Sequence, residues 1–348
     1  MWPNQRRGGG FSRGVDFLRK TLQKNLAWKA RLGFLVPRFI TNDPFVYRLG
    51  LQVFILARRV RLPYGSPFFK HGISGKKLRE GLSHFSSIKK QVTAREKVSR
   101  VVARKGGGSI AALTCYDYPM ARLLDAAGVD VLLVGDSLGM VVLGFPDTTH
   151  VTLAHMLHHV EAVARARPEA LIIGDLPIHS YDTPGQAVET ARRLIAAGAD
   201  AVKLEGGAGQ AEKVRAITSA GITVCGHLGV LPQSVLEEDG YHKKGKSPEE
   251  MQAILEGAEA LIEAGVFAIV LESVTPRAAE MITRSISVPT IGIGCGKGTC
   301  DGEIAVITDL LGSFPWFVPP FARPEADLSG ETSRAVAAYI SRVKGHRK

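Results

Sequence analysis

Acidic side chains recur directly after short apolar runs in the middle of this 348-residue sequence. Asp136 and Asp175 each follow such a run, and a third run ends in Lys203-Leu204-Glu205. Carboxylates that gather in one place repel one another unless a cation offsets them. Oxygen ligands favour a hard cation, Mg²⁺ first and Mn²⁺ second. We therefore predict that Asp136, Asp175 and Glu205 hold a divalent metal ion.

Two more polar side chains end apolar runs further along the chain. His227 follows Gly226, and Glu272 follows Leu271. One histidine is too few for a typical zinc site, so zinc is disfavoured. A single acid after a strand is more often a helix N-cap than a ligand, but four acids after successive runs favour catalysis. For His227, a structural and a functional role both remain open.

Lys203 lies two residues before Glu205, and alternation along a strand places both side chains on the same face. The ammonium group of Lys203 can therefore pair with the carboxylate of a substrate. One alternative is a structural ion pair with a neighbouring acid. A Schiff base is less favoured, because nearby acids keep the amine protonated.

A regular alternation of elements that begins at Ser109 must position these residues. The apolar runs that predict strands are Ile110 to Thr114, Val131 to Gly135, Leu171 to Gly174, Ala201 to Leu204, Thr223 to Gly226, Ala268 to Leu271, Thr290 to Ile293 and, more weakly, Trp316 to Val318. Helices are predicted between them. Three of these helices begin at a hydroxyl residue followed by proline, at Thr183-Pro184, Ser247-Pro248 and Thr275-Pro276.

Eight such strand–helix units predict an α/β fold, a parallel (β/α)8 TIM barrel with its active site at the carboxyl ends of the strands. A doubly wound open sheet is the structural alternative. It is disfavoured because no glycine-rich phosphate-binding fingerprint follows the first strand.

Residues 1–92 differ sharply in charge from the rest of the chain. They hold 19 Lys and Arg against three acids, whereas the whole chain has a net charge of +11. The remaining residues therefore carry a net charge of −5, which argues against nucleic-acid binding by this larger part. We predict a basic, largely irregular N-terminal arm over residues 1–92 and one catalytic domain over residues 93–348.

The composition of the arm is typical of a mitochondrial or chloroplast transit peptide. We favour a mitochondrial destination, with a plastid or cytoplasmic location as alternatives. A disordered basic tail and an arm that binds nucleic acid or a membrane surface also remain open. No apolar run approaches the roughly 20 residues of a membrane span. The four cysteines show no CxxC spacing, so we expect reduced thiols.

The segments that contain the candidate residues resemble the ketopantoate (3-methyl-2-oxobutanoate) hydroxymethyltransferase family. The matching stretches read "LTCYDYPMARLLDAAGVDVLLVGDSLGMVVLG", "IIGDLP", "AGADAVKLEGG", "VCGHLGVLPQSV", "VLESVT" and "PTIGIGCG…DGE". They occur in order over about residues 109 to 325, and together they are highly specific. The arm lies outside the resemblance.

The resemblance implies a barrel of the phosphoenolpyruvate/pyruvate superfamily type. It also implies transfer of a hydroxymethyl group from 5,10-methylenetetrahydrofolate to 3-methyl-2-oxobutanoate, giving 2-dehydropantoate for pantothenate synthesis. A homo-oligomer, commonly a decamer, is expected. The implied Mg²⁺ ligands are Asp136, Asp175 and Glu205, and the implied proton acceptor is Glu272. The implied contacts to the oxo acid are Asp136, Ser137, Asp175, Lys203 and His227.

Two departures from the family pattern follow the seventh predicted strand. An extra residue is present around Lys297 to Cys300, and Glu303 stands where Gln is usual. These departures concern the geometry of this loop and the folate contacts, and they leave the metal site unaffected.

One mechanism fits both the residues and the resemblance. A 2-oxo acid can chelate Mg²⁺ through its carboxylate and ketone oxygens, and the metal then stabilises the enolate. Lys203 and Ser137 would hold the substrate carboxylate, and Glu272 would transfer the C3 proton. The enolate carbon would attack the folate-bound methylene group.

Two other functions compete with this one. The first is a Mg²⁺-dependent lyase or mutase that acts on another 2-oxo acid. The second is a non-catalytic barrel whose basic arm binds nucleic acid or a membrane. We expect small-molecule substrates, with no nucleic-acid partner and no membrane span.

Overall fold

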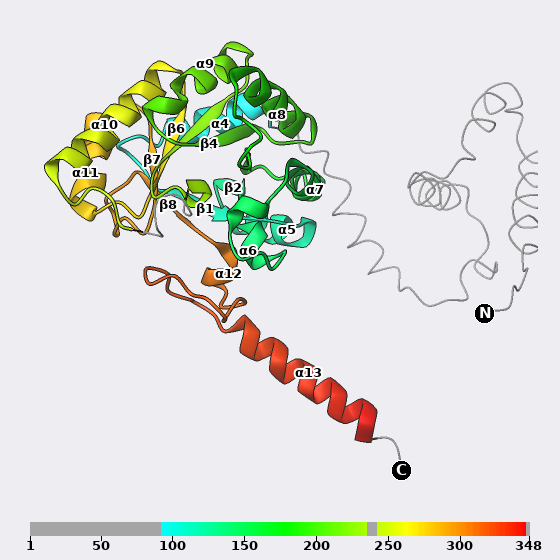
Figure 1. Ribbon diagram of the computed structural model, residues 1–348. Helices are drawn as coiled ribbons and strands as arrows, with labels where there is room; N and C mark the ends of the chain where they lie inside the picture. The colour runs from blue at the N-terminus through cyan, green and yellow to red at the C-terminus, as the bar shows by residue number, and fades with distance from the viewer. Residues whose placement is uncertain (1–91, 235–241, 346–348) are drawn as a thin grey trace, which may run out of the picture. The chain divides into compact units, whose positions relative to one another are not determined.

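The computed structural model describes residues 92–234 and 242–345 (Figure 1). The chain divides into two units, residues 1–87 and 88–348, and every described residue belongs to the second. The predicted arm over residues 1–92 therefore lies almost entirely outside the described residues. Its predicted boundary and role stay predictions.

Eight parallel strands close into a barrel in the order in which they occur in the sequence. They are β1 (Ile110–Thr114), β2 (Val131–Val134), β3 (Leu171–Asp175), β4 (Ala201–Glu205), β5 (Val224–Gly229), β6 (Ala268–Glu272), β7 (Thr290–Ile293) and β8 (Gly302–Ala305). The barrel closes where β1 pairs with β8 and Ile110 lies opposite Gly302. The predicted (β/α)8 barrel is confirmed, and the open sheet is excluded.

The eighth strand differs from the prediction. The apolar run Trp316 to Val318 is no strand, and the side chain of Trp316 is 80 % exposed. The barrel closes instead through β8, which starts at a glycine and points Glu303 outward to solvent. Space explains the glycine, because a Cβ at Gly302 would lie 2.4 Å from Cβ of Ile110. A large apolar residue at this point would keep β1 and β8 apart.

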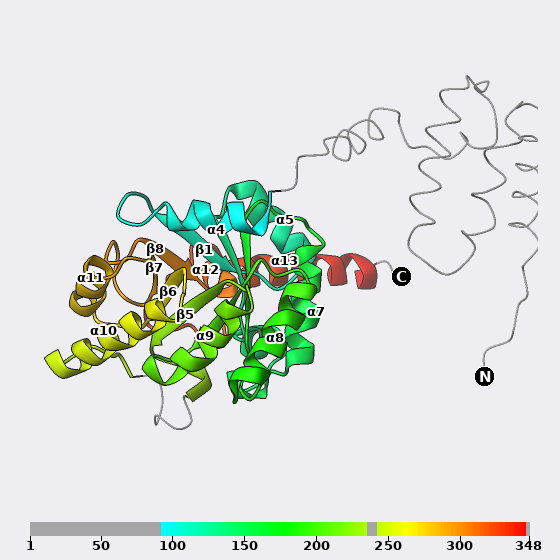
Figure 2. The ribbon, with the colours of Figure 1, turned by 90° about the horizontal axis from the view of Figure 1, so that it is seen from above.

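Helices surround the barrel (Figure 2). The longer ones beside the strands are α4 (Ala94–Val102), α5 (Tyr118–Ala127), α7 (Leu153–Ala164), α8 (Pro184–Ala196), α9 (Ala211–Ser219), α10 (Pro248–Glu263) and α11 (Pro276–Ser285). Two short helices, α6 (Leu138–Val141) and α12 (Ile307–Leu310), follow β2 and β8. The three predicted helix starts at proline are confirmed.

Alternation along the strands divides the core into two layers. Residues such as Leu132 and Leu204 pack against helix residues such as Leu194 in the outer layer. Ile173 and Ala201 belong to a second cluster that is composed almost entirely of strand residues and fills the barrel interior. Side chains two residues apart on a strand lie on the same face. A polar side chain two residues beyond one of these interior residues, at the carboxyl end of its strand, must therefore point into the barrel mouth.

The C-terminal helix α13 (Leu328–Gly345) packs differently from the other helices. None of its residues is buried. Its exposed apolar side chains include Val336, Tyr339, Ile340 and Val343. Within the described residues, no helix has the length and apolar character that crossing a membrane would require.

Candidate active site

The strand ends bring most of the predicted site residues together. Asp175 ends β3 and lies in register with Lys203 of β4, while Glu205 lies in register with His227 of β5. These four residues continue the inward-facing set of their strands, and each is at most 4 % exposed. Glu272 ends β6 on the same face. The sequence alternation therefore placed these side chains correctly.

Lys203 is the central positive charge of the cluster. Its Nζ lies 2.9 Å from Oδ1 of Asp175, 3.7 Å from Oε1 of Glu205 and 3.2 Å from Nδ1 of His227. Burial alone would lower the pKa of the Lys203 amine, but Asp175, Glu205 and Asp136 outweigh it and raise that pKa. Lys203 is therefore protonated, which disfavours a Schiff base. The structural ion pair with a neighbouring acid is present.

Asp136 and Asp175 are neighbours on adjoining strand ends. The backbone N–H of Asp136 points at Oδ2 of Asp175 at 3.4 Å. Burial, followed by the charges of Asp175 and Glu205, raises the pKa of Asp136 well above its usual range. Burial also raises the pKa of Asp175, although Lys203 opposes this effect. The pair is therefore short of positive charge, because Lys203 pairs with Asp175 and must also offset Glu205 and Asp136.

His227 lies between two acids. Its Nδ1 is 3.2 Å from Oε1 of Glu205, and its Nε2 is 3.3 Å from Oε2 of Glu272, a contact without hydrogen-bond alignment. Burial and Lys203 lower the pKa of the imidazole, but Glu205 and Glu272 outweigh them and raise it to about 9. His227 lowers the pKa of Glu205 in turn, against the effect of burial. The imidazole thus links the buried cluster to Glu272, whose side chain is 19 % exposed.

Ser137 lies at the edge of this cluster. It precedes α6, but its hydroxyl makes no capping hydrogen bond. Its Oγ lies instead 2.9 Å from the hydroxyl of Tyr116. Tyr116 is the second residue after the end of β1. Ser137 is therefore held by another side chain and is placed beside Asp136.

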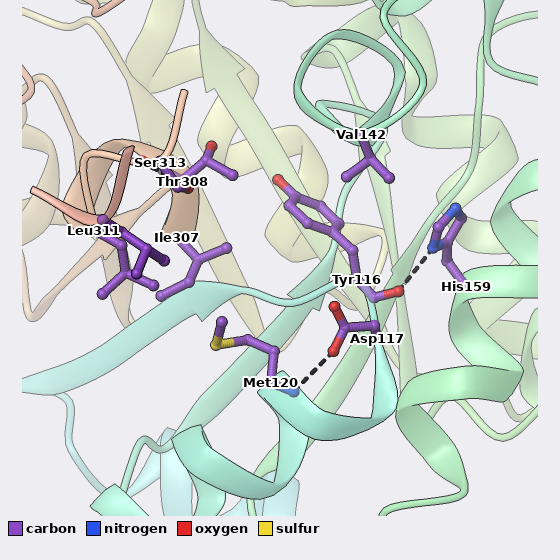
Figure 3. Close-up of a pocket in the computed structure, with 10 residues that line it drawn as sticks. Tyr116, Asp117, Met120, Val142, His159, Ile307, Thr308, Leu311 and Ser313 are labelled. Atoms are coloured by element: carbon purple, nitrogen blue, oxygen red, sulfur yellow. Dashed lines mark hydrogen bonds between the residues drawn. The ribbon is translucent and has the colours of Figure 1, made fainter. Parts of the chain in front are cut away.

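A cavity of about 240 Å³ is lined in part by Tyr116. Figure 3 shows Met120, Val142, Ile307 and Leu311 around it. Among its polar lining groups, the buried hydroxyl of Thr308 has no hydrogen-bond partner. Tyr116 thus belongs to this mostly apolar cavity and also contacts Ser137 through its hydroxyl at 2.9 Å.

Sequence reasoning missed Gln233 and Tyr181. Gln233 lies in the short helix η5 (Pro232–Ser234) after β5, and its Nε2 donates to Oδ2 of Asp136 at 2.7 Å. Its backbone N–H donates to Oε2 of Glu205 at 3.1 Å. Tyr181 donates its hydroxyl hydrogen to Oε1 of Gln233. The sequence signal that could have found Gln233 was its position in "LPQS". This segment lies shortly after β5, the strand that contains the predicted site residue His227.

The three predicted metal ligands do not form a ready three-ligand site. Across residues 92–234 and 242–345, no group of three or more His, Cys, Asp or Glu side chains is arranged to hold a metal ion. Glu205 is engaged by His227 and Gln233. Asp136 and Asp175 still fit Mg²⁺, which commonly uses one or two carboxylates and keeps several waters. Buried Oδ1 of Asp175 is paired with Nζ of Lys203 at 2.9 Å, and Oδ2 faces the backbone N–H of Asp136.

The barrel and the buried charged cluster at its mouth define a β/α-barrel enzyme. A family model described as ketopantoate hydroxymethyltransferase matches residues 95–347. The chain belongs to this family.

Curated relatives agree with the family model. A protein of Ignicoccus hospitalis is 51% identical over 256 residues, which cover 73% of this chain and 95% of the relative. One of Cenarchaeum symbiosum is 51% identical over 241 residues, which cover 69% and 91%. Both have the name 3-methyl-2-oxobutanoate hydroxymethyltransferase.

Solved structures confirm the fold class. Phosphonopyruvate hydrolase in complex with oxalate and Mg²⁺ is 16% identical, with a TM-score of 0.52 over 74% of this chain and 89% of that chain. 2,3-Dimethylmalate lyase, a member of the PEP mutase/isocitrate lyase superfamily, is 20% identical, with a TM-score of 0.51 over 73% and 89%. These likenesses show the barrel fold alone, and the expected superfamily type stays a prediction.

Proposed function

We propose that this protein transfers a hydroxymethyl group from 5,10-methylenetetrahydrofolate to 3-methyl-2-oxobutanoate, giving 2-dehydropantoate in pantothenate synthesis. Membership of the ketopantoate hydroxymethyltransferase family supports the acceptor and the product. The observation that supports the chemistry most directly is the buried cluster of Asp136, Asp175, Lys203 and Glu205 at the barrel mouth. A small anion with a ketone would bind there to the Lys203 ammonium and to a cation held by the carboxylates, because charge interactions are strong where water is excluded.

Mg²⁺, or Mn²⁺, is the proposed cofactor. Asp136 and Asp175 would hold it, with Glu205 close by. A bound cation would supply Lewis-acid polarisation of the substrate ketone. It would also offset the carboxylate charge that Lys203 and His227 leave uncompensated.

The remaining roles belong to side chains. Lys203 and Ser137 would hold the substrate carboxylate, and the Asp136, Asp175 and His227 side chains would line the same space. Glu272 would accept the proton from C3 of the oxo acid, which leaves the C3 electron pair free to bond to the folate methylene carbon. Water would supply the hydroxyl oxygen as the tetrahydrofolate amine leaves. The greater exposure of Glu272 suits a group that must exchange its proton.

Product analysis tests this proposal. The purified protein is mixed with 3-methyl-2-oxobutanoate, methylenetetrahydrofolate and Mg²⁺, and 2-dehydropantoate is measured by mass spectrometry. Product should form, disappear with a chelator and return with added Mg²⁺. Oxaloacetate without folate serves as the comparison for the lyase or mutase alternative. Turnover of oxaloacetate with no 2-dehydropantoate formed would overturn the assignment.

We further propose that residues 1–92 direct the protein to mitochondria and that residues 93–348 form the catalytic domain. The support is the concentration of positive charge in the arm. A fluorescent protein fused after residue 92 should enter mitochondria, and removal of the arm should leave turnover unchanged. Accumulation in plastids, or loss of turnover without the arm, would contradict this proposal.

Homo-oligomer formation, with a decamer as the expected size, is also proposed. In α13, Val336, Ile340 and Val343 recur at helical spacing, and Tyr339 lies beside them. A helix with no buried residue and an apolar stripe needs a covering surface, and a second copy of the chain supplies one. Light scattering should give a multiple of the monomer mass, and Ile340→Glu should reduce it. A monomeric wild-type protein would exclude this proposal.

A further inference from the structure

We propose that Gln233 is a positioning residue that sets the spacing of the Asp136 and Glu205 carboxylates and so tunes the affinity of the site for a divalent cation. Gln233 is 4 % exposed and lies beside the barrel mouth on η5. The inference rests on the proposed function insofar as it takes Asp136 to be a metal ligand.

Every hydrogen-bonding group on the Gln233 side chain is used. Nε2 donates to Oδ2 of Asp136 at 2.7 Å and to the carbonyl oxygen of Leu176 at 2.9 Å. Oε1 accepts the hydroxyl hydrogen of Tyr181. The backbone N–H of Gln233 donates to Oε2 of Glu205 at 3.1 Å. One residue thus binds two of the three predicted metal ligands, and it binds them through different groups.

The chemistry of the neighbours fixes the orientation of the amide. The Leu176 carbonyl can only accept a hydrogen bond, and an ionised Asp136 likewise only accepts. Rotating the amide by half a turn would point Oε1 at both of these oxygens, so the Leu176 carbonyl keeps the NH₂ group on their side. Tyr181 is itself only 8 % exposed, and its hydroxyl donates to Oε1 and supports this orientation.

This arrangement leaves one oxygen of Asp136 available for a ligand. Gln233 occupies Oδ2, so Oδ1 is the oxygen of Asp136 that could bind a cation. Partners that orient metal-binding side chains typically change metal affinity or activity by roughly 10- to 100-fold when they are removed. Gln233 meets the structural conditions for such a partner.

Two variants and one control separate this role from a merely structural one. Gln233→Glu keeps the size but replaces the donating NH₂ by an oxygen that faces Asp136. Tyr181→Phe removes only the hydroxyl that donates to Oε1 of Gln233. The matched control is Gln252→Glu on α10, where Nε2 also donates to a carboxylate, Oε1 of Glu256 at 3.0 Å, but the side chain is exposed.

Calorimetric titration with MgCl₂ measures the Mg²⁺ dissociation constant of each protein, and thermal unfolding is recorded alongside. Gln233→Glu should weaken Mg²⁺ binding by roughly 10-fold or more, Tyr181→Phe should weaken it less, and Gln252→Glu should match the wild type. Raised KM for the oxo acid at sub-saturating Mg²⁺ should accompany the first two changes. If Gln233→Glu does not fold, Tyr181→Phe alone decides.

Wild-type Mg²⁺ affinity in both Gln233→Glu and Tyr181→Phe would overturn the inference, as would an absence of Mg²⁺ binding to the wild type. Lowered melting temperatures with unchanged Mg²⁺ affinity would assign Gln233 to structure alone and reject the inference too. A failed proposed function is distinguishable, because it removes 2-dehydropantoate formation from the wild type while leaving the Mg²⁺ titrations interpretable.

Discussion

Nζ of Lys203 lies 2.9 Å from Oδ1 of Asp175, and the two side chains are only 4 % and 1 % exposed. The contact joins adjacent strand ends, because Asp175 and Lys203 are in register across β3 and β4. A buried charge pair of this kind is costly to break, since removing one partner leaves the other charge without compensation. The pair should therefore contribute to the stability of the barrel mouth, and it adjoins the proposed cation site.

Replacing the lysine tests this dependence. Lys203→Met should lower the free energy of unfolding by about 3 kcal/mol or more near neutral pH, because Asp175 loses its ion-pair partner and the buried acids around it lose a positive charge. Added Mg²⁺ should raise the melting temperature of Lys203→Met more than that of the wild type. The control is Lys246→Met, at an exposed position. Thermal unfolding with and without Mg²⁺ measures both effects, and wild-type behaviour of Lys203→Met would refute the prediction.

Asp309 predicts a pH dependence of stability. This residue of α12 is 7 % exposed, and burial raises its pKa from 3.8 to about 6. A folded-state pKa above the unfolded value means that the stabilising contribution is complete below pH 3.8 and is lost as the pH rises through about 6. Two pKa units correspond to at most about 3 kcal/mol.

Asp309→Asn should therefore stabilise the fold by about 1–3 kcal/mol at pH 8 and have little effect at pH 4. Urea unfolding at the two pH values is the measurement. A stabilisation of equal size at both would show that the carboxyl does not titrate as inferred.

Cys300 should be the most reactive of the four thiols. A hydrogen bond from the thiol of Cys295 lowers the pKa of Cys300 to about 6, and burial opposes this shift. Burial raises the pKa values of Cys115 and Cys225 to about 12. Because the thiolate is the reactive form, iodoacetamide at pH 7 should label Cys300 first, as peptide mass spectrometry can show. Cys300→Ser should remove the fast phase, and earlier labelling of Cys115 would contradict the ordering.

The strand ends could be predicted because alternation has a fixed period. Asp175 and Lys203 each continue the inward-facing side chains of an apolar run, so their common face follows from the sequence. Which acid pairs with Lys203 could not be predicted in this way, because the strand register decides it.

All four cysteines are free thiols, as expected.

The failures have physical reasons as well. At β8, a glycine permits close approach to Ile110, and neither glycine nor the outward-facing Glu303 marks a strand by hydrophobicity. Trp316, by contrast, is apolar and yet exposed.

Gln233 lies on the short helix η5 in the loop after β5, where side chains follow no regular period. Its role depends on contacts to Asp136 and Glu205, which are far from it in the sequence.

Glu272 is the residue on which the proposed chemistry depends most. It ends β6 beside His227, and Oε2 lies 3.3 Å from Nε2 of that imidazole. If Glu272 accepts the C3 proton, the protein should exchange that proton with solvent even in the absence of folate. Glu272→Gln removes the basic oxygen but keeps the size of the side chain. Glu303→Gln on β8 is the matched control, since Glu303 is exposed.

The measurement is proton NMR of 3-methyl-2-oxobutanoate incubated in D₂O with Mg²⁺ and each protein, following the loss of the C3–H signal. The wild type and Glu303→Gln should exchange this proton at similar rates. Glu272→Gln should exchange it roughly 10²-fold more slowly or worse while still binding the oxo acid. Exchange by Glu272→Gln at the wild-type rate, or no exchange by the wild type, would contradict the account.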